Sequence, residues 1–168
     1  DRLDCGETIN NYPIAYETYG KLNEKKDNAI LAFHALTGDQ FLTGINPVTN
    51  KKGWWTYLIG PSKPIDTNKF FVICANVIGG CMGSFGPSTV DEKSKKPLGT
   101  NFPVITINDM VNAQYNLLDH FKIKKLFCVI GGSMGGMQVL QFVSNFPNAA
   151  KNAIPIACTA NHLSLIHI

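Results

Sequence analysis

Several patterns that assign a function directly are missing from this sequence. The five cysteines form no Cys-x-x-Cys pair and no cysteine–histidine spacing of a metal site. There is no internal repeat, and no apolar run has the length of a membrane span. Charged residues make up only 16% of the chain, the net charge is a mild +3, and the lysines are scattered rather than aligned in a basic stripe. These absences argue against a metal centre, a membrane span and a nucleic-acid partner.

The composition indicates one globular domain in a reducing compartment. The chain has 168 residues, of which 45% are hydrophobic, enough for a single domain with a real core. An odd number of cysteines without a pairing pattern predicts a cytoplasmic location, where thiols stay reduced.

Four continuous apolar runs predict buried strands. They cover residues 29–36, 70–77, 126–131 and 152–158, and the alternating segment 14–20 predicts a further strand. Continuous rather than alternating apolar strands are typical of parallel sheets that are covered on both faces.

Two helices are predicted between these strands. Residues 108–121 have helical spacing with Asn108 as the N-cap, and residues 134–146 follow the third buried strand. The apolar stripe of this second helix is predicted to contain Met137, Leu140 and Val143. The order of elements predicts an α/β fold with a mostly parallel, doubly wound sheet. The long connection between residues 77 and 107 is predicted to be functional or disordered.

The segment "GGSMG", residues 131–135, fits G-x-S-x-G between a buried strand and a helix. Glycines on either side remove Cβ atoms that would collide in so sharp a turn, so Ser133 is predicted to present its hydroxyl as a nucleophile. No lysine follows, as a P-loop requires, and Ser133 occupies the place of a glycine in the dinucleotide-binding fingerprint. A purely structural turn is the remaining alternative.

An acyl transfer through Ser133 also needs backbone donors for the oxyanion. The amide of Met134 is one candidate, and the amide of Leu36 in "HALTG", which closes the first buried strand, is the other. His34 is expected to shape this loop, which is otherwise an ordinary strand-ending turn. Predicted substrate-binding residues lie in the loops after two strands: Thr37, Gly38, Asn76, Gly79 and Gly80. The glycines of the second loop either let a ligand approach the backbone or only permit sharp turns.

Four segments together resemble the homoserine O-acetyltransferase family, acyltransferases of methionine biosynthesis with the α/β-hydrolase fold. They are "AFHALTGD", "NVIGGCMGSFGPST", "FPVITINDMVNAQYNLLDH" and "GGSMGGMQVLQF", and the resemblance runs from Asp4 to about His162. It implies Ser133 as the nucleophile, with the amides of Leu36 and Met134 as the oxyanion hole. It also implies a ping-pong transfer from acetyl-CoA to L-homoserine, no bound cofactor, no metal and a homodimer.

Parts of the family pattern are not found in this sequence. The family's catalytic Asp and His, its lid and C-terminal strands, and its arginine for the substrate carboxylate fall beyond the last residue. We therefore expect residues 1–162 to be the N-terminal part of a larger α/β-hydrolase domain, inactive alone and with an open sheet edge. His162 and His167 are not expected to be the base, and residues 163–168, "LSLIHI", are predicted to be a non-native tail.

Other activities remain open from the sequence alone. Within the same family, the transfer of a succinyl group or a serine acceptor would need only different pocket residues. A serine hydrolase or esterase would pass the acyl group to water instead. A non-catalytic binding module with this fold is disfavoured because it would be expected to have lost Ser133.

Overall fold

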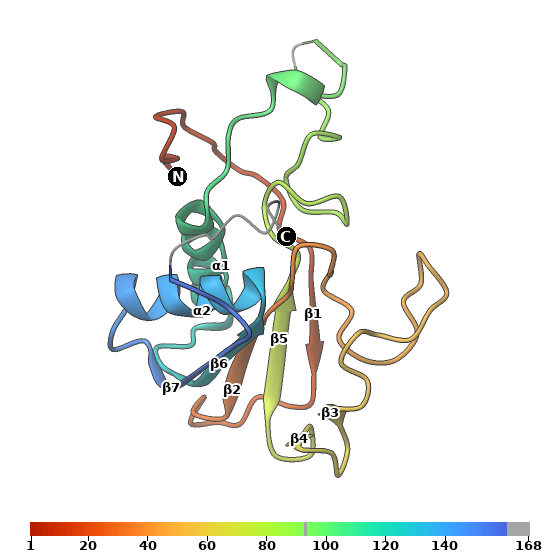
Figure 1. Cartoon of the computed structure of the whole chain (residues 1–168), viewed down its shortest axis with the longest axis vertical. Coiled ribbons are helices and arrows are strands. Elements are labelled where there is room, and N and C mark those ends of the chain that lie inside the picture. The colour runs from red at the N-terminus through yellow and green to blue at the C-terminus, as the bar shows by residue number, and fades with distance from the viewer. Residues whose placement is uncertain (93, 161–168) are drawn as a thin grey trace.

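The computed structural model describes residues 1–92 and 94–160 and contains one main sheet with two helices beside it (Figure 1). The main strands, in the order in which they lie side by side, are β1 (Tyr16–Tyr19), β5 (Phe71–Ala75), β2 (Ala29–Phe33), β6 (Leu126–Gly132) and β7 (Ala150–Ile156). The last four are parallel, and only β1 runs antiparallel to its neighbour. The prediction of a mostly parallel α/β sheet is confirmed.

The two helices are α1 (Ile107–Phe121) and α2 (Met134–Asn145), and the remaining elements are short. A second sheet consists of β3 (Ile59–Gly60) and β4 (Ile65–Asp66), and a 3₁₀ turn, η1, spans Gly99–Asn101. Sequence analysis missed β3 and β4 because two residues are too few to show a period. Among the described residues, no helix has the length and apolar character needed to cross a membrane.

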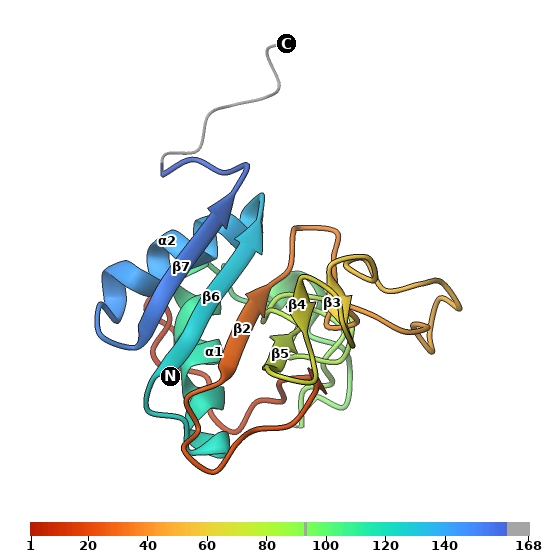
Figure 2. The ribbon, with the colours of Figure 1, turned by 90° about the horizontal axis from the view of Figure 1, so that it is seen from below.

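The central strands are buried on both faces, as their continuous apolar sequences predict. In β2, Leu31 and Phe33 pack into a core that includes α1 and α2, whereas Ile30 and Ala32 pack into a second core on the opposite face. That second face is covered by the segment between β2 and β5, which includes the small sheet lying close to β5 in Figure 2. A strand covered on both faces has no need of polar residues at alternate positions.

The N-cap of helix α1 lies two residues earlier than the sequence predicts. Its N-cap is Thr106, not Asn108, because Thr106 has extended backbone angles and its hydroxyl accepts the Asp109 amide. The Asp109 carboxylate in turn accepts the Thr106 amide at 2.9 Å, which completes a capping box. The Asn108 side chain instead donates to Asp4.

Helix α2 is rotated relative to the predicted stripe. Met137, Leu140 and Val143 are only half-buried, and the buried residues of the helix are Gly135, Gly136, Gln138, Val139 and Phe142. The cause is a close backbone contact: a Cβ on Gly135 would lie 2.1 Å from the carbonyl oxygen of Phe33. The glycine face of α2 therefore lies against β2, and the apolar stripe is turned partly away.

Strand β7 forms an edge of the sheet and is displaced by two residues from the predicted range 152–158. Ile154 and Ile156 are 45% and 40% exposed, which agrees with the expected open apolar edge.

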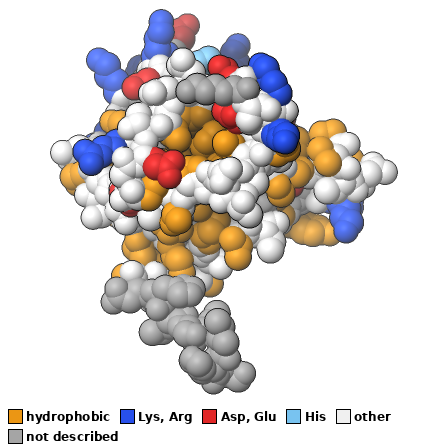
Figure 3. All heavy atoms as spheres, turned by 90° about the horizontal axis from the view of Figure 1, so that it is seen from above, with side chains coloured by type: hydrophobic (Ala, Val, Ile, Leu, Met, Phe, Trp, Pro, Cys, Tyr) orange, Lys and Arg blue, Asp and Glu red, His pale blue; other side chains and the backbone are white. Residues whose placement is uncertain are grey.

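Figure 3 shows hydrophobic side chains gathered toward the middle of one face of the molecule, with charged side chains mostly around it. His162 and the predicted tail 163–168 lie outside the described residues.

The contact between α2 and β2 predicts that two glycines of the serine turn differ in their tolerance of alanine. We expect Gly135→Ala to lower the free energy of unfolding by about 2 kcal/mol, because backbone atoms cannot yield to the added methyl as a flexible side chain could. Gly132→Ala is the matched control, since its Cβ would meet nothing within 4 Å among the described residues. Urea denaturation measures both, and equal midpoints for the two variants would contradict the proposed contact.

Candidate active site

Ser133 is at the sharp turn that joins β6 to α2. Its backbone angles are φ 55° and ψ −121°, a conformation that costs an L-residue roughly 1–3 kcal/mol. The turn is fixed on both sides, because the Ser133 amide donates to Ile156 at 3.0 Å and its carbonyl accepts the Met137 amide at 3.1 Å. The side chain is exposed and makes no capping bond to the helix. A strained, exposed hydroxyl is the arrangement that a nucleophile needs.

Glycines make this turn possible by close approach rather than by positive φ. A Cβ on Gly131 would lie 2.4 Å from the Gly135 carbonyl oxygen, and Gly135 itself meets Phe33 as described above. The expected collisions are thus present at Gly131 and Gly135. Among the described residues no such collision is found at Gly132, so the sequence interpretation was wrong about the reason for that glycine.

The loop after β2 and Ser133 lie at the same end of the sheet, the end where the parallel strands finish. This follows because β2 and β6 are neighbours with Phe33 opposite Gly131. This loop turns tightly, and the Gly38 amide donates to the Ala35 carbonyl at 2.8 Å. Leu36, 76% exposed, is in the turn, and its amide has no hydrogen-bond partner among the described residues.

Met134 supplies the second free amide at this end of the sheet. It is the first residue of α2, and first-turn amides have no partner within their own helix. Of the residues predicted to bind substrate, Thr37 is exposed in the turn after β2, and Gly38 is half-buried beside it.

His34 connects this loop to its neighbour. The imidazole is only 1% exposed, and its Nε2 accepts the Val77 amide at 3.1 Å, so Nδ1 carries the proton and donates to the Ala35 carbonyl at 2.7 Å. Burial lowers the pKa of His34, against the opposing effects of its bond to Ala35 and of the Asp39 carboxylate. The ring is therefore neutral at pH 7. The expectation that His34 shapes its loop is confirmed.

The loop after β5 holds itself together through Asn76, which is 2% exposed. The Asn76 Oδ1 accepts the Met82 amide at 3.2 Å, and its Nδ2 lies 3.3 Å from His34 Nε2. This places the Asn76 side chain beneath the loop, not at the predicted contact with substrate. A Cβ on Gly80 would lie 2.6 Å from Asn76 Oδ1, and Gly79 has φ +87°, so both glycines serve sharp turns here.

One buried polar residue of the site was missed by sequence reasoning. Gln138 of α2 is fully buried, and its Nε2 donates to the His34 carbonyl at 3.3 Å and to the Met134 carbonyl at 3.5 Å. Its Oε1 accepts from Gln114 of α1 at 2.7 Å. Gln138 therefore joins the end of β2 to the first turn of α2. Its only sequence signal is a polar side chain one helical turn after Met134.

Other nucleophiles and bases compete poorly with Ser133. Burial raises the pKa of Cys74, and it raises the pKa of Cys128 to about 11, so both thiols are protonated and inert at neutral pH. Both ring nitrogens of His34 are occupied, and the exposed His120 on α1 bonds to Tyr16, so neither histidine serves Ser133. Within residues 1–92 and 94–160, no cluster of His, Cys, Asp and Glu could hold a metal ion.

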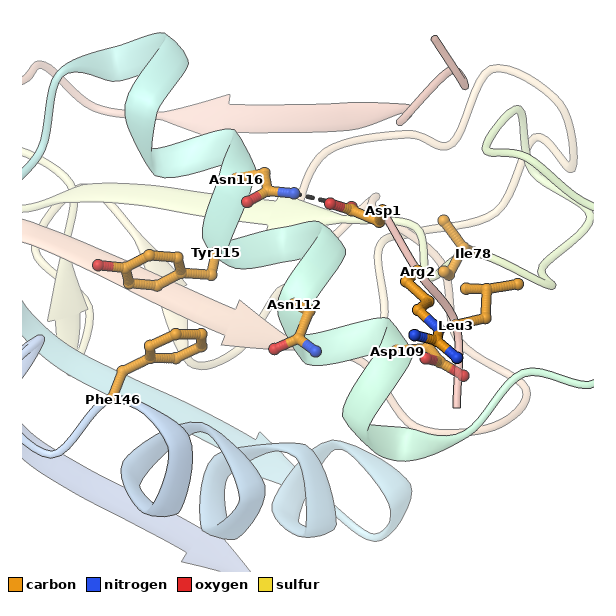
Figure 4. Close-up of a pocket in the computed structure, with 9 residues that line it drawn as sticks. All are labelled: Asp1, Arg2, Leu3, Ile78, Asp109, Asn112, Tyr115, Asn116 and Phe146. Carbon is orange, nitrogen blue, oxygen red and sulfur yellow. Dashed lines mark hydrogen bonds between the residues drawn. The ribbon is translucent and has the colours of Figure 1, made fainter. Parts of the chain in front are cut away.

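The cavity drawn in Figure 4 lies elsewhere, between the N-terminal segment and α1. It measures about 340 Å³ and contains none of the residues predicted for the site. Its polar groups bond to one another and to nearby backbone: Asn116 donates to the Asp1 carboxylate at 2.8 Å, and the Asp109 carboxylate accepts the Asp4 amide at 3.0 Å. This cavity is therefore separate from the serine turn.

Comparison with known proteins agrees with this geometry. The chain is 73% identical over 161 residues to the homoserine O-acetyltransferase of Pelagibacter ubique, covering 96% of the chain and 43% of that protein. The crystal structure of homoserine O-acetyltransferase from Bacillus anthracis superposes with a TM-score of 0.88 at 31% identity, covering 98% of this chain and 46% of that one. An acetylester hydrolase from Corynebacterium glutamicum gives a TM-score of 0.81 at 35% identity, with 97% and 43% covered.

The chain thus spans less than half the length of the relatives it matches. Residues 28–167 match the family described as having the alpha/beta hydrolase fold. They include the serine turn, the loop after β2 and all four parallel strands. The chain belongs to the alpha/beta hydrolase fold family.

Proposed function

We propose that the protein containing this chain transfers an acetyl group from acetyl-CoA to the hydroxyl of L-homoserine, with Ser133 as the covalent carrier. The observation that carries the proposal is the strained, exposed Ser133 between β6 and α2, in a chain 73% identical to a homoserine O-acetyltransferase. Family resemblance supplies the two substrates, and the site geometry supports the chemistry.

The reaction proceeds in two balanced steps. Ser133 Oγ attacks the thioester carbonyl while its proton passes to a base; the carbon–sulfur bond then breaks, CoA leaves as the thiol, and an acetyl ester remains on Ser133. The hydroxyl of L-homoserine then attacks that ester while its proton passes to the base. The bond between the acyl carbon and Ser133 Oγ breaks, O-acetyl-L-homoserine leaves, and Ser133 regains a proton from the base. The amides of Leu36 and Met134 hold the negative oxygen of each tetrahedral intermediate. The proposal assigns the base to the part of the relatives' length that this chain does not span.

A second candidate function is ester hydrolysis. It is favoured by the likeness to an acetylester hydrolase, whose 35% identity is no lower than that of the acetyltransferase structure. The two reactions share the acyl-enzyme and differ only in whether water or an amino-acid hydroxyl accepts the acyl group. The acceptor dependence of turnover therefore distinguishes them.

The cellular setting is also part of the proposal. All five cysteines are free, and two are buried as small apolar residues, which supports a reducing cytoplasm. The chemistry requires no metal or bound cofactor, because the nucleophile and the oxyanion donors are protein groups. The homodimer and the choice of acetyl over succinyl remain predictions from the family resemblance.

We expect Ser133→Ala to reduce acyl transfer to background in the complete gene product that contains this sequence. Wild-type protein mixed with acetyl-CoA alone should gain the mass of one acetyl group, and peptide mapping should place it on residue 133. Ser144→Ala is the matched control, because Ser144 is an exposed serine on the same helix, and it should retain both activity and adduct. An adduct on another residue would contradict the assigned nucleophile.

Release of CoA should depend on the acceptor. In steady state we expect free thiol to accumulate at least ten times faster with L-homoserine than with water alone, measured with a thiol-reactive dye. Parallel assays with succinyl-CoA and with L-serine test the other members of the family. Equal rates with and without any amino acid would favour the hydrolase.

A further inference from the structure

The peptide group between Ala35 and Leu36 is held by its carbonyl end. The oxygen of Ala35 accepts two hydrogen bonds, from the Gly38 amide at 2.8 Å and from His34 Nδ1 at 2.7 Å. In a trans peptide the carbonyl and the N–H point in opposite directions. Whatever orients the Ala35 carbonyl therefore also orients the Leu36 N–H, the amide assigned above to the oxyanion hole.

The imidazole that holds this carbonyl is itself fixed. Its Nε2 accepts the Val77 amide at 3.1 Å and is 3.3 Å from the Asn76 amide nitrogen, both in the loop after β5. On the main-chain side, the His34 carbonyl accepts from the buried Gln138 at 3.3 Å. The His34 ring is thus fixed between the loops after β2 and β5, with its single proton on Nδ1.

We infer that His34 is a positioning residue for acyl transfer, which aims the Leu36 N–H at the developing oxyanion by holding the carbonyl of the same peptide. The inference rests on the proposed function, because it takes the Leu36 amide as an oxyanion donor. His34 neither touches substrate nor transfers a proton. Its contribution is made in the transition state, where the charge on the carbonyl oxygen develops.

A purely structural role predicts something different. In that case the important bond of His34 is the one to Val77, which joins the loops after β2 and β5, and the bond to Ala35 is incidental. Two amide substitutions separate these bonds. His34→Asn puts an N–H donor near the position of Nδ1 and keeps the bond to Ala35, whereas His34→Gln puts an acceptor near the position of Nε2 and keeps the bond to Val77.

The test measures acyl transfer by both variants in the complete gene product. Loss of an oxyanion donor costs about 10²–10³-fold in kcat, so a misaimed donor in His34→Gln should cost roughly 10–100-fold, with KM for acetyl-CoA changed by less than about 3-fold. His34→Asn should stay within about 5-fold of the wild-type kcat. His120→Gln, at an exposed position on α1, is the control and should match wild type.

Equal losses in the two variants, a larger loss in His34→Asn, or a loss confined to KM would overturn the inference. The Ser133 adduct in wild-type protein is scored separately: if it is absent, the proposed function fails, whatever the variants do. If it forms and the variants behave alike, only the role of His34 fails.

A measurement on unsubstituted protein keeps the inference falsifiable if a variant does not fold. Nitrogen-15 NMR of the His34 ring reports which nitrogen carries the proton at pH 7. We expect the proton on Nδ1, as the bond to Ala35 requires. A proton on Nε2 would overturn the inference, because Nδ1 could then not donate to the carbonyl.

Discussion

The first turn of α2 lies directly against the last carbonyl groups of β2, and the whole site depends on this contact. Only glycine fits at position 135, because a Cβ there would lie 2.1 Å from the Phe33 oxygen. The contact brings the start of α2, with its free amide at Met134, beside the loop that carries Leu36. It also fixes the rotation of the helix, which is why Gln138 rather than Met137 faces inward.

Buried side-chain amides link the start of α2 to helix α1 and to the end of β2. Gln114 of α1 donates to Gln138 of α2, and Gln138 donates to the His34 carbonyl at the end of β2. Gln138 is hydrogen-bonded at both of its polar atoms, and a buried amide satisfied in this way specifies one geometry more strictly than an apolar contact of the same size. The two helices and the end of β2 are therefore fixed relative to one another at the point where the oxyanion donors lie.

Much of the fold could be predicted from the sequence, because the information was local. Continuous apolar runs identified the buried parallel strands, and the GGSMG segment between strand and helix identified the serine turn. The errors had both local and distant causes. Thr106 replaced Asn108 as the cap through its reciprocal bonds with Asp109, and the stripe of Met137 was displaced by the backbone of β2. The role of Asn76 was missed because sequence alone cannot reveal that a loop amide bonds within its own loop.

The backbone angles of Ser133 limit which chemistry this scaffold can adopt. At φ 55° a branched Cβ collides with the main chain, so threonine is a poor substitute there, whereas cysteine has the same unbranched shape as serine. The nucleophile on this bend is thus confined to side chains that are unbranched at Cβ, such as serine, cysteine and aspartate. Variation in acceptor and acyl group must instead come from residues outside the bend.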